Sequence, residues 1–144
     1  MRGLAAYADA FGDPTAREAS RRAAVVFLSR KLFRRPSDGS PIRRDFLRLH
    51  YHLCYQDDVR VGLKGIGEMG LLRAPQAAGA MWWLKGRELP DGGWPADARF
   101  FRVSHTFAPA CEYAEWGGGD PRKRNDWFTA DALSVLRQAG WITL

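Results

Sequence analysis

The fold is decided by the stretch Trp83-Leu84-Lys85-Gly86-Arg87-Glu88-Leu89-Pro90-Asp91-Gly92-Gly93-Trp94-Pro95. An amphipathic run that contains Met81 ends in this stretch at Leu89, and a proline and an Asp-Gly-Gly turn follow it. This order predicts a helix that ends at a tight turn, because proline does not continue a helix and glycine accommodates the turn. The turn returns an indole to the helix end, so we expect Trp94 to be a packed, structural side chain.

The composition is that of one globular domain, which we place at residues 1–144. Of the 144 residues, 46% are hydrophobic and 12% are aromatic, which is enough for a packed core. No run approaches the roughly 18 apolar residues of a transmembrane helix, and the N-terminal residues lack the apolar region of a signal peptide. Cys54 and Cys111 are too few for a disulfide framework, so we expect free thiols in a cytoplasmic protein.

Apolar spacing and capping residues predict about six helices and no strand, so we expect an all-α fold. Glycine or an acidic residue marks several helix ends, as at Gly12, Asp13 and Asp57. The predicted helices cover residues 2–11, 14–33, 45–49, 57–70, 75–89 and 125–139. Residues 96–124 are expected to form a long loop, in which 109–115 could be a short helix.

Four motifs occur along the chain in the order found in one repeat family. They are Leu49-His50-Tyr51, Asp58-Val59, Asp91-Gly92-Gly93-Trp94-Pro95 and Asn125-Asp126-Trp127-Phe128-Thr129. Their order resembles that of uncharacterised bacterial proteins with prenyltransferase and squalene-oxidase repeats, of the terpenoid cyclase and protein prenyltransferase superfamily. The resemblance implies an α/α toroid built of helical hairpins. About six helices fill half such a ring, so we expect a partial toroid that a second half-toroid chain or another copy of this chain completes.

Cyclases of this superfamily carry an Asp-x-Asp-Asp motif, in which a protonated carboxyl group starts the reaction. The matching frame here is Tyr55-Gln56-Asp57-Asp58, with tyrosine at the first acidic position. The resemblance marks Asp57 and Asp58 as catalytic candidates. The alternative is structural: Asp57 caps a helix and Asp58 lies in its first turn, where the helix dipole keeps both charged. We therefore expect that this chain alone does not cyclise polyprenes by protonation and is not an enzyme of that kind.

Aromatic side chains gather around the same motifs. In this superfamily, an isoprenoid cavity is lined by π faces that stabilise cationic intermediates. The ligand-binding candidates that the resemblance implies are His50, Tyr51, Tyr55, Trp94, Phe100, Phe101 and Trp116. Packing in the core is the alternative use, and helical spacing favours it for Trp82 and Trp127. The aromatic side chains of residues 100–116 could equally form a lid.

Protein prenyltransferases of the superfamily bind zinc through Asp, Cys and His. The residues of these types that could act as ligands here are His50, His52, Cys54, His105 and Cys111. They fall in two irregular segments and complete no four-ligand zinc pattern. We therefore predict no metal site, and nothing in the sequence requires a cofactor.

The net charge of +6 comes from the first third of the chain. Residues 1–48 contain 11 Lys and Arg against 5 Asp and Glu, whereas residues 49–144 contain 11 of each kind. The excess surrounds the loop at 36–41 and provides an anion-binding candidate, formed by Arg34, Arg35, Arg43 and Arg44. Such a cluster can face phosphate, diphosphate or anionic lipid. Nucleic acid is a less expected partner, and a solvated surface is the alternative.

These observations leave three interpretations open. The first is a cyclase-like or prenyltransferase-like helical domain that binds an apolar ligand, for example an isoprenoid. The second is a non-catalytic interaction module, whose exposed apolar surface another subunit covers. The third is anion or nucleic-acid binding through the basic loop. A deep aromatic cavity would favour the first, a flat apolar face the second, and salt-dependent binding the third.

Overall fold

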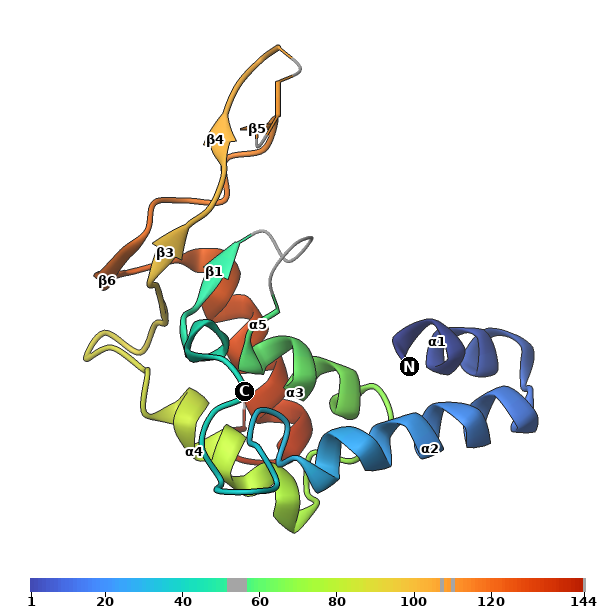
Figure 1. Ribbon diagram of the computed structural model, residues 1–144. Helices are drawn as coiled ribbons and strands as arrows, with labels where there is room; N and C mark the ends of the chain where they lie inside the picture. The colour runs from blue at the N-terminus through green and yellow to red at the C-terminus, as the bar shows by residue number, and fades with distance from the viewer. Residues whose placement is uncertain (52–56, 107, 110, 144) are drawn as a thin grey trace.

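The computed structural model describes residues 1–51, 57–106, 108–109 and 111–143. In these ranges the chain forms five α-helices, two short 3-10 helices and six short strands (Figure 1). The helices are α1 (Arg2–Phe11), α2 (Pro14–Ser29), η1 (Arg44–Leu47), α3 (Val59–Gly67), η2 (Pro75–Ala77), α4 (Ala78–Lys85) and α5 (Asp126–Ala139). The strands are β1 (His50–Tyr51), β2 (Pro95–Ala96), β3 (Ala98–Arg99), β4 (Arg102–Val103), β5 (Cys111–Glu112) and β6 (Asp120–Arg124).

Local capping chemistry sets the helix ends at the start of the chain. Gly12 ends α1 in the left-handed conformation, with φ 65°, which glycine adopts without a Cβ clash. Asp13 then caps α2, because its Oδ1 accepts hydrogen bonds from the backbone N–H groups of Thr15 (2.8 Å) and Ala16 (3.0 Å). The two helices form a hairpin that lies beside the other helices, at the right of Figure 1.

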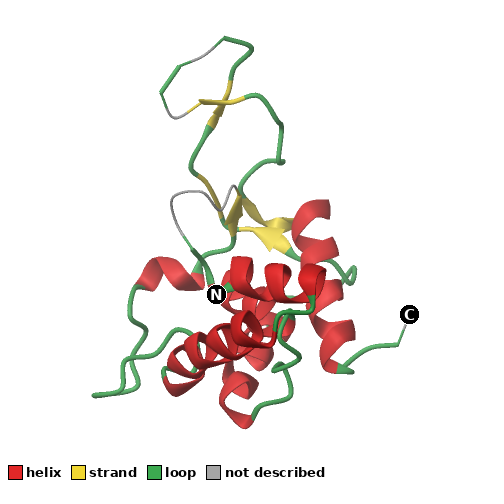
Figure 2. Cartoon of the chain, turned by 90° about the vertical axis from the view of Figure 1, so that its right-hand side faces the viewer, coloured by secondary structure: helices red, strands yellow, loops and turns green. Residues whose placement is uncertain are grey.

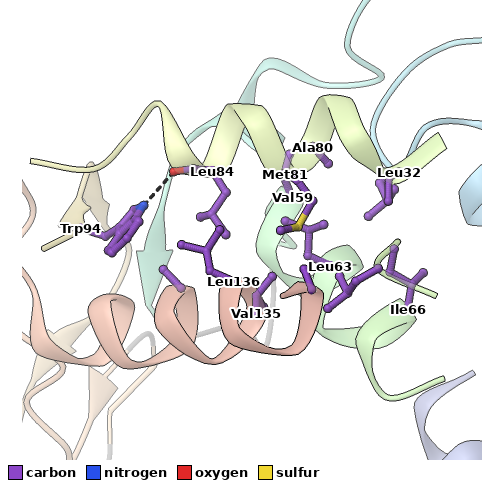
Figure 3. Close-up of a cluster of buried hydrophobic side chains, with 14 of the residues drawn as sticks. Leu32, Val59, Leu63, Ile66, Ala80, Met81, Leu84, Trp94, Val135 and Leu136 are labelled. Atoms are coloured by element: carbon purple, nitrogen blue, oxygen red, sulfur yellow. Dashed lines mark hydrogen bonds between the residues drawn. The ribbon is translucent and has the colours of Figure 1, made fainter. Parts of the chain in front are cut away.

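The main hydrophobic core lies between α3, α4 and α5 (Figure 3). The buried residues of α5 recur at helical spacing, and they are Phe128, Ala132, Val135, Leu136 and Ala139. Leu63 and Ile66 of α3 and Met81 and Leu84 of α4 belong to the same cluster. The α5 residues form one apolar stripe along the helix, and this stripe is its core-facing side.

The turn after α4 holds Trp94 in this core, where the side chain is 1% exposed. Its Nε1 donates a hydrogen bond to the backbone oxygen of Leu84 in the last turn of α4, at 2.7 Å (Figure 3). The backbone N–H of Trp94 donates to Thr129 Oγ1 of α5 at 3.0 Å. Gly92 provides the positive φ that the turn requires, 79°. The expectation that Trp94 is a packed side chain is confirmed, and the turn joins α4 to α5.

The all-α prediction is wrong. In the described ranges, the six strands form three two-stranded sheets. β1 pairs with β3 and β4 pairs with β5 in parallel, whereas β2 and β6 are antiparallel with an irregular register. The strands lie to one side of the helices, and β4 and β5 project farthest from them (Figures 1 and 2). The chain therefore has a mixed α/β fold with five α-helices, and the expected six-helix half of an α/α toroid is not its architecture.

Tertiary contacts form these strands, which is why the sequence pattern did not reveal them. Except for β6, each strand has two residues, too few to show an alternating pattern. The backbone oxygen of Leu49 accepts hydrogen bonds from the N–H groups of Asp97 (2.7 Å) and Ala98 (3.2 Å), and Asp97 Oδ2 accepts one from the N–H of Leu49 at 2.8 Å. These bonds align β1 with β3. In the region expected to hold a short helix, residues 109–115, the structure has strand β5.

Two tryptophans that helical spacing placed in the core lie at the surface instead. The side chain of Trp82 is 66% exposed and that of Trp127 is 51% exposed. The ring of Trp82 contacts Trp141 with 4.7 Å between ring centres, and the ring of Trp127 contacts Trp116 at 5.0 Å. Helical spacing groups residues on one face of a helix, but only the position of the neighbouring elements decides which face is buried.

The longest helix, α2, has 16 residues. Within the described ranges, no helix combines the length and the apolar character that crossing a bilayer demands.

Candidate ligand-binding site

A pocket of about 470 Å³ lies between the C-terminal part of α2 and the start of α3. Most of its walls are apolar, so we call it the apolar pocket. It is lined by Met1, Arg2, Val26, Phe27, Arg30, Leu32, Phe33, Ile42, Phe46, Asp57, Asp58, Val59, Val61 and Gly62. The lining thus includes both aspartates that the sequence marked as catalytic candidates, together with two arginines.

A left-handed turn after α2 shapes one wall of the apolar pocket. The N–H of Leu32 donates to the backbone oxygen of Phe27 (2.8 Å), and that of Lys31 donates to the oxygen of Leu28 (2.9 Å), a pattern that closes many helices. Lys31 and Leu32 have φ values of 45° and 68°, a conformation that costs a residue other than glycine about 1–2 kcal/mol. The turn buries Leu32 in the wall of the pocket and leaves Lys31 exposed.

Asp58 caps α3 where that helix meets the apolar pocket. Its Oδ1 accepts hydrogen bonds from the N–H groups of Arg60 (2.9 Å) and Val61 (3.3 Å), and its Oδ2 lies 3.3 Å from Arg60 Nη2. The cap is therefore Asp58, and Asp57, which we predicted as the cap, is the exposed residue before it. Burial raises the pKa of Asp58, although the positive charge of Arg60 acts to lower it. Burial thus works against the charge that we expected the helix N-terminus to preserve.

Arg60, which the sequence analysis did not identify, is a fully buried charge on α3. Its Nη1 donates a hydrogen bond to Asp131 Oδ2 of α5 at 2.9 Å, and its Nη2 donates to the backbone oxygen of His50 at 3.2 Å. Its guanidinium carbon lies 4.4 Å from the ring centre of Tyr51 and 4.0 Å from that of Phe128, a cation–π geometry. A buried charge requires such partners, and through them Arg60 connects α3 to β1 and α5.

Asp131 is the shared acceptor of this network. The hydroxyl of Tyr51 donates to its Oδ2 at 2.6 Å, and Lys64 Nζ donates to its Oδ1 at 2.6 Å. Burial disfavours the charged form of Asp131, but the hydrogen bonds from Lys64 and Tyr51 and the charge of Arg60 outweigh it and lower its pKa. Burial and the hydrogen bond to Asp131 raise the pKa of Tyr51. In the sequence, the one signal for this network was Asp131, an acidic residue close to the apolar stripe of α5.

The structure brings several predicted ligand-binding residues together outside the lining of the apolar pocket. The ring of Tyr51 stacks on Trp116 with 5.3 Å between centres, and the ring of His50 meets Phe100 edge-on at 5.0 Å. Phe101, the residue after Phe100, is buried. These contacts are aromatic packing, the alternative that the sequence left open, and they connect β1 to the segments after β3 and before β6.

The metal-ligand candidates are only partly described. His52, Cys54 and Tyr55, the last a ligand-binding candidate, lie outside the described residues. His105 is exposed and Cys111 is partly exposed. Within the described ranges, no three His, Cys, Asp or Glu side chains come close enough together to hold a metal ion.

A second pocket, of about 490 Å³, lies at the C-terminal end of α2. We call it the basic pocket, and it is lined by Ser29, Arg30, Lys31, Arg34, Arg35, Pro36, Ser37, Asp38 and Gly39. It contains Arg34 and Arg35 of the predicted anion-binding group, whereas Arg43 and Arg44 are not part of its lining. Arg43 pairs with Asp45 instead, at 3.3 Å. The four arginines therefore do not form one site.

The side chains of the basic pocket also stabilise its own loop. Arg34 and Arg35 each donate a hydrogen bond to a backbone carbonyl oxygen of the loop, at 2.7 Å and 3.3 Å. A carbonyl oxygen carries no formal charge, so neither of these hydrogen bonds pairs an arginine with an anion. Asp38 is the acidic residue of the lining, and hydrogen bonds from Ser40 lower its pKa. Four cationic side chains thus face one carboxylate.

Comparison with family models, with curated proteins and with solved structures found no match to this chain. The resemblance to cyclase and prenyltransferase repeats therefore stays a prediction from the motifs.

Proposed function

We propose that this protein binds a small apolar molecule, of the size of an isoprenoid chain, in the apolar pocket between α2 and α3. The observation that carries this proposal is the solvent exposure of large apolar side chains in a concave wall. Val26 is 54% exposed and Phe27 is 40% exposed, and both line the pocket. A ligand that covered them would remove apolar surface from water, which is favourable by about 25 cal/mol for each Å².

The size and the walls of the pocket support this role. A volume of about 470 Å³ falls within the roughly 300–1,000 Å³ typical of small-molecule sites. Such sites combine apolar walls with a few polar groups, and this one has Asp58 as a buried carboxyl group and Arg30 as an exposed cation. The proposal assigns binding only and includes no chemical step at Asp57 or Asp58.

A charge placed on the apolar wall tests the proposal, with a matched control one residue away. Val26→Asp should weaken binding of the neutral isoprenoid alcohol farnesol by at least about tenfold, because a carboxylate would have to lose water when the ligand covers it. Val25→Asp is the control, since Val25 lies on the same helix, is 62% exposed and does not line the pocket. Titration calorimetry measures both. Equal affinities for the two variants, or no binding to the unaltered protein, would refute the proposal.

The exposed face of α1 favours a second candidate function, self-association. Leu4, Tyr7 and Phe11 recur at helical spacing and are all exposed, and the rings of Tyr7 and Phe11 lie 4.7 Å apart. Contiguous apolar surface of this kind commonly marks an interface, so a second copy of the chain is the proposed partner. Phe11→Glu should then convert a dimer to a monomer in sedimentation experiments. A monomer before the substitution would exclude this function.

The cellular location remains part of the proposal as well. A cytoplasmic protein is the prediction from the cysteine content, because two cysteines are too few for the disulfide framework of a secreted protein. Localisation of the untagged protein by cell fractionation tests it directly.

A further inference from the structure

Arg30 lines both the apolar pocket and the basic pocket. The two pockets are therefore adjacent at the C-terminal end of α2. A ligand held by both would need an apolar part for one pocket and a negatively charged part for the other. This adjacency restricts the chemistry of the ligand more than either pocket does alone.

The left-handed turn after α2 directs consecutive residues to the two pockets. Lys31 lines the basic pocket and Leu32 lines the apolar pocket. Both have positive φ values, 45° and 68°, which residues with a Cβ rarely adopt. Strained backbone of this kind occurs frequently at ligand sites. Here it places a cation and an apolar side chain on either side of the boundary between the pockets.

The charges at this boundary are available to an anion. In the part of the chain that the structure describes, neither Arg30 nor Lys31 forms an ion pair, whereas Arg2 of the apolar pocket is paired with Glu68. The exposed carboxyl group in the lining of the apolar pocket belongs to Asp57. A negatively charged group would be repelled by that carboxylate and attracted by the four cations of the basic pocket.

We propose that the ligand is a single-chain amphiphile with an anionic head, in which the apolar chain occupies the apolar pocket and the head contacts Arg30 and Lys31. This inference rests on the proposed function and adds the headgroup to it. Phosphate and carboxylate heads share the required chemistry, because guanidinium and ammonium groups donate charge-assisted hydrogen bonds to both.

Matched ligands separate this inference from the proposed function. Dodecyl phosphate and dodecanol share one chain and differ in the head, and both are titrated below the concentration at which micelles form. The unaltered protein should bind dodecyl phosphate at least about tenfold more tightly than dodecanol, the ratio expected for one charge-assisted hydrogen bond. Binding of dodecanol alone, or equal affinities, would overturn the inference and leave the proposed function intact. Failure of both ligands to bind would refute the proposed function.

Two substitutions locate the head. Arg30→Gln should reduce the preference for dodecyl phosphate over dodecanol, because the head loses one charged partner while Lys31 remains. Arg22→Gln is the control, an exposed arginine on the same helix that lines neither pocket. Circular dichroism verifies that both variants fold. An unchanged preference in Arg30→Gln would contradict the inference.

Further arms of the experiment identify the source of the anion. Inorganic phosphate alone should bind much more weakly than dodecyl phosphate, because it leaves the apolar pocket empty. Phosphatidylcholine vesicles with and without phosphatidic acid test a membrane surface. Binding to the acidic vesicles without binding to soluble dodecyl phosphate would overturn the inference, and binding to soluble dodecyl phosphate supports it.

Discussion

Replacing Trp94 by alanine tests the packing of the turn on which this fold depends. The side chain is 1% exposed, and truncation of a buried tryptophan costs about 3–5 kcal/mol through lost burial and the cavity that remains. The backbone oxygen of Leu84, which accepts the Nε1 hydrogen bond at 2.7 Å, would also lose its partner, at a cost of about 1 kcal/mol. We therefore expect Trp94→Ala to lower the free energy of unfolding by about 4–6 kcal/mol.

Two further variants make this expectation specific. Trp94→Phe keeps an aromatic ring but removes the donor, so it should cost about 1–2 kcal/mol. Trp82→Ala removes the same side chain from a surface position that is 66% exposed, so it should cost less than about 1 kcal/mol. At roughly 3 °C for each kcal/mol in a chain of this size, the melting temperature of Trp94→Ala should fall by about 12–18 °C.

Differential scanning calorimetry and urea unfolding measure these differences, provided that the transitions are two-state. If Trp94→Ala and Trp82→Ala lower the melting temperature equally, the buried position of Trp94 and the attachment of the turn to α4 are refuted. A Trp94→Phe variant as unstable as Trp94→Ala would show that the hydrogen bond, and not the burial, dominates.

Three other predictions follow from the buried network and the turn after α2. Asp131→Asn should lower the free energy of unfolding by about 3 kcal/mol at neutral pH, because it weakens the pairing of buried Arg60. The pKa of Asp131 is lowered below 3.8 in the folded protein, so the stability that its charge provides is present above that pH and is lost as the pH falls through the folded pKa. Urea unfolding between pH 2 and 7 should therefore show that the stability difference between the unaltered protein and Asp131→Asn shrinks at low pH. A stability difference that stays constant over this range would contradict the prediction. Lys31→Gly should raise the free energy of unfolding by about 1 kcal/mol, because glycine adopts the positive φ without strain. The same substitution should weaken the binding of dodecyl phosphate, because it removes a cation. A lower free energy of unfolding would show that the turn is unstrained. Incubation with squalene should yield no cyclised product by mass spectrometry, because the Asp58 carboxyl group caps α3 and faces Arg60; a product that disappears in Asp58→Asn would make the chain an enzyme.

The parts of the fold that the sequence predicted are those that local chemistry determines. Gly12 and Asp13 set the boundary between α1 and α2 through their own backbone and side-chain properties. Asn125 similarly caps α5 by accepting a hydrogen bond from the N–H of Phe128 at 3.1 Å. The strands are different, because Leu49 and Asp97 are 48 residues apart in the sequence. No local pattern encodes such a contact, and the all-α prediction was wrong for that reason.

The sequence predicted only those parts of the candidate site that are formed by residues adjacent in the chain. Arg34 and Arg35 are adjacent in the chain and line the same pocket, whereas Arg43 lies beyond the loop and pairs with Asp45. The apolar pocket was not predicted, because its walls come from separate segments that look like ordinary core residues in the sequence. Arg60 was missed for the same reason, since a charged residue on a helix is usually solvated and its partners lie on other elements.

The position of the first residues of the chain matters for how the protein is produced. Met1 and Arg2 line the apolar pocket, so any polypeptide fused ahead of Met1 would begin at the pocket wall. An affinity tag at that end could occupy the apolar surface in place of a ligand and obscure every binding measurement. No residue of α5 lines this pocket, and tags for these experiments therefore belong after α5.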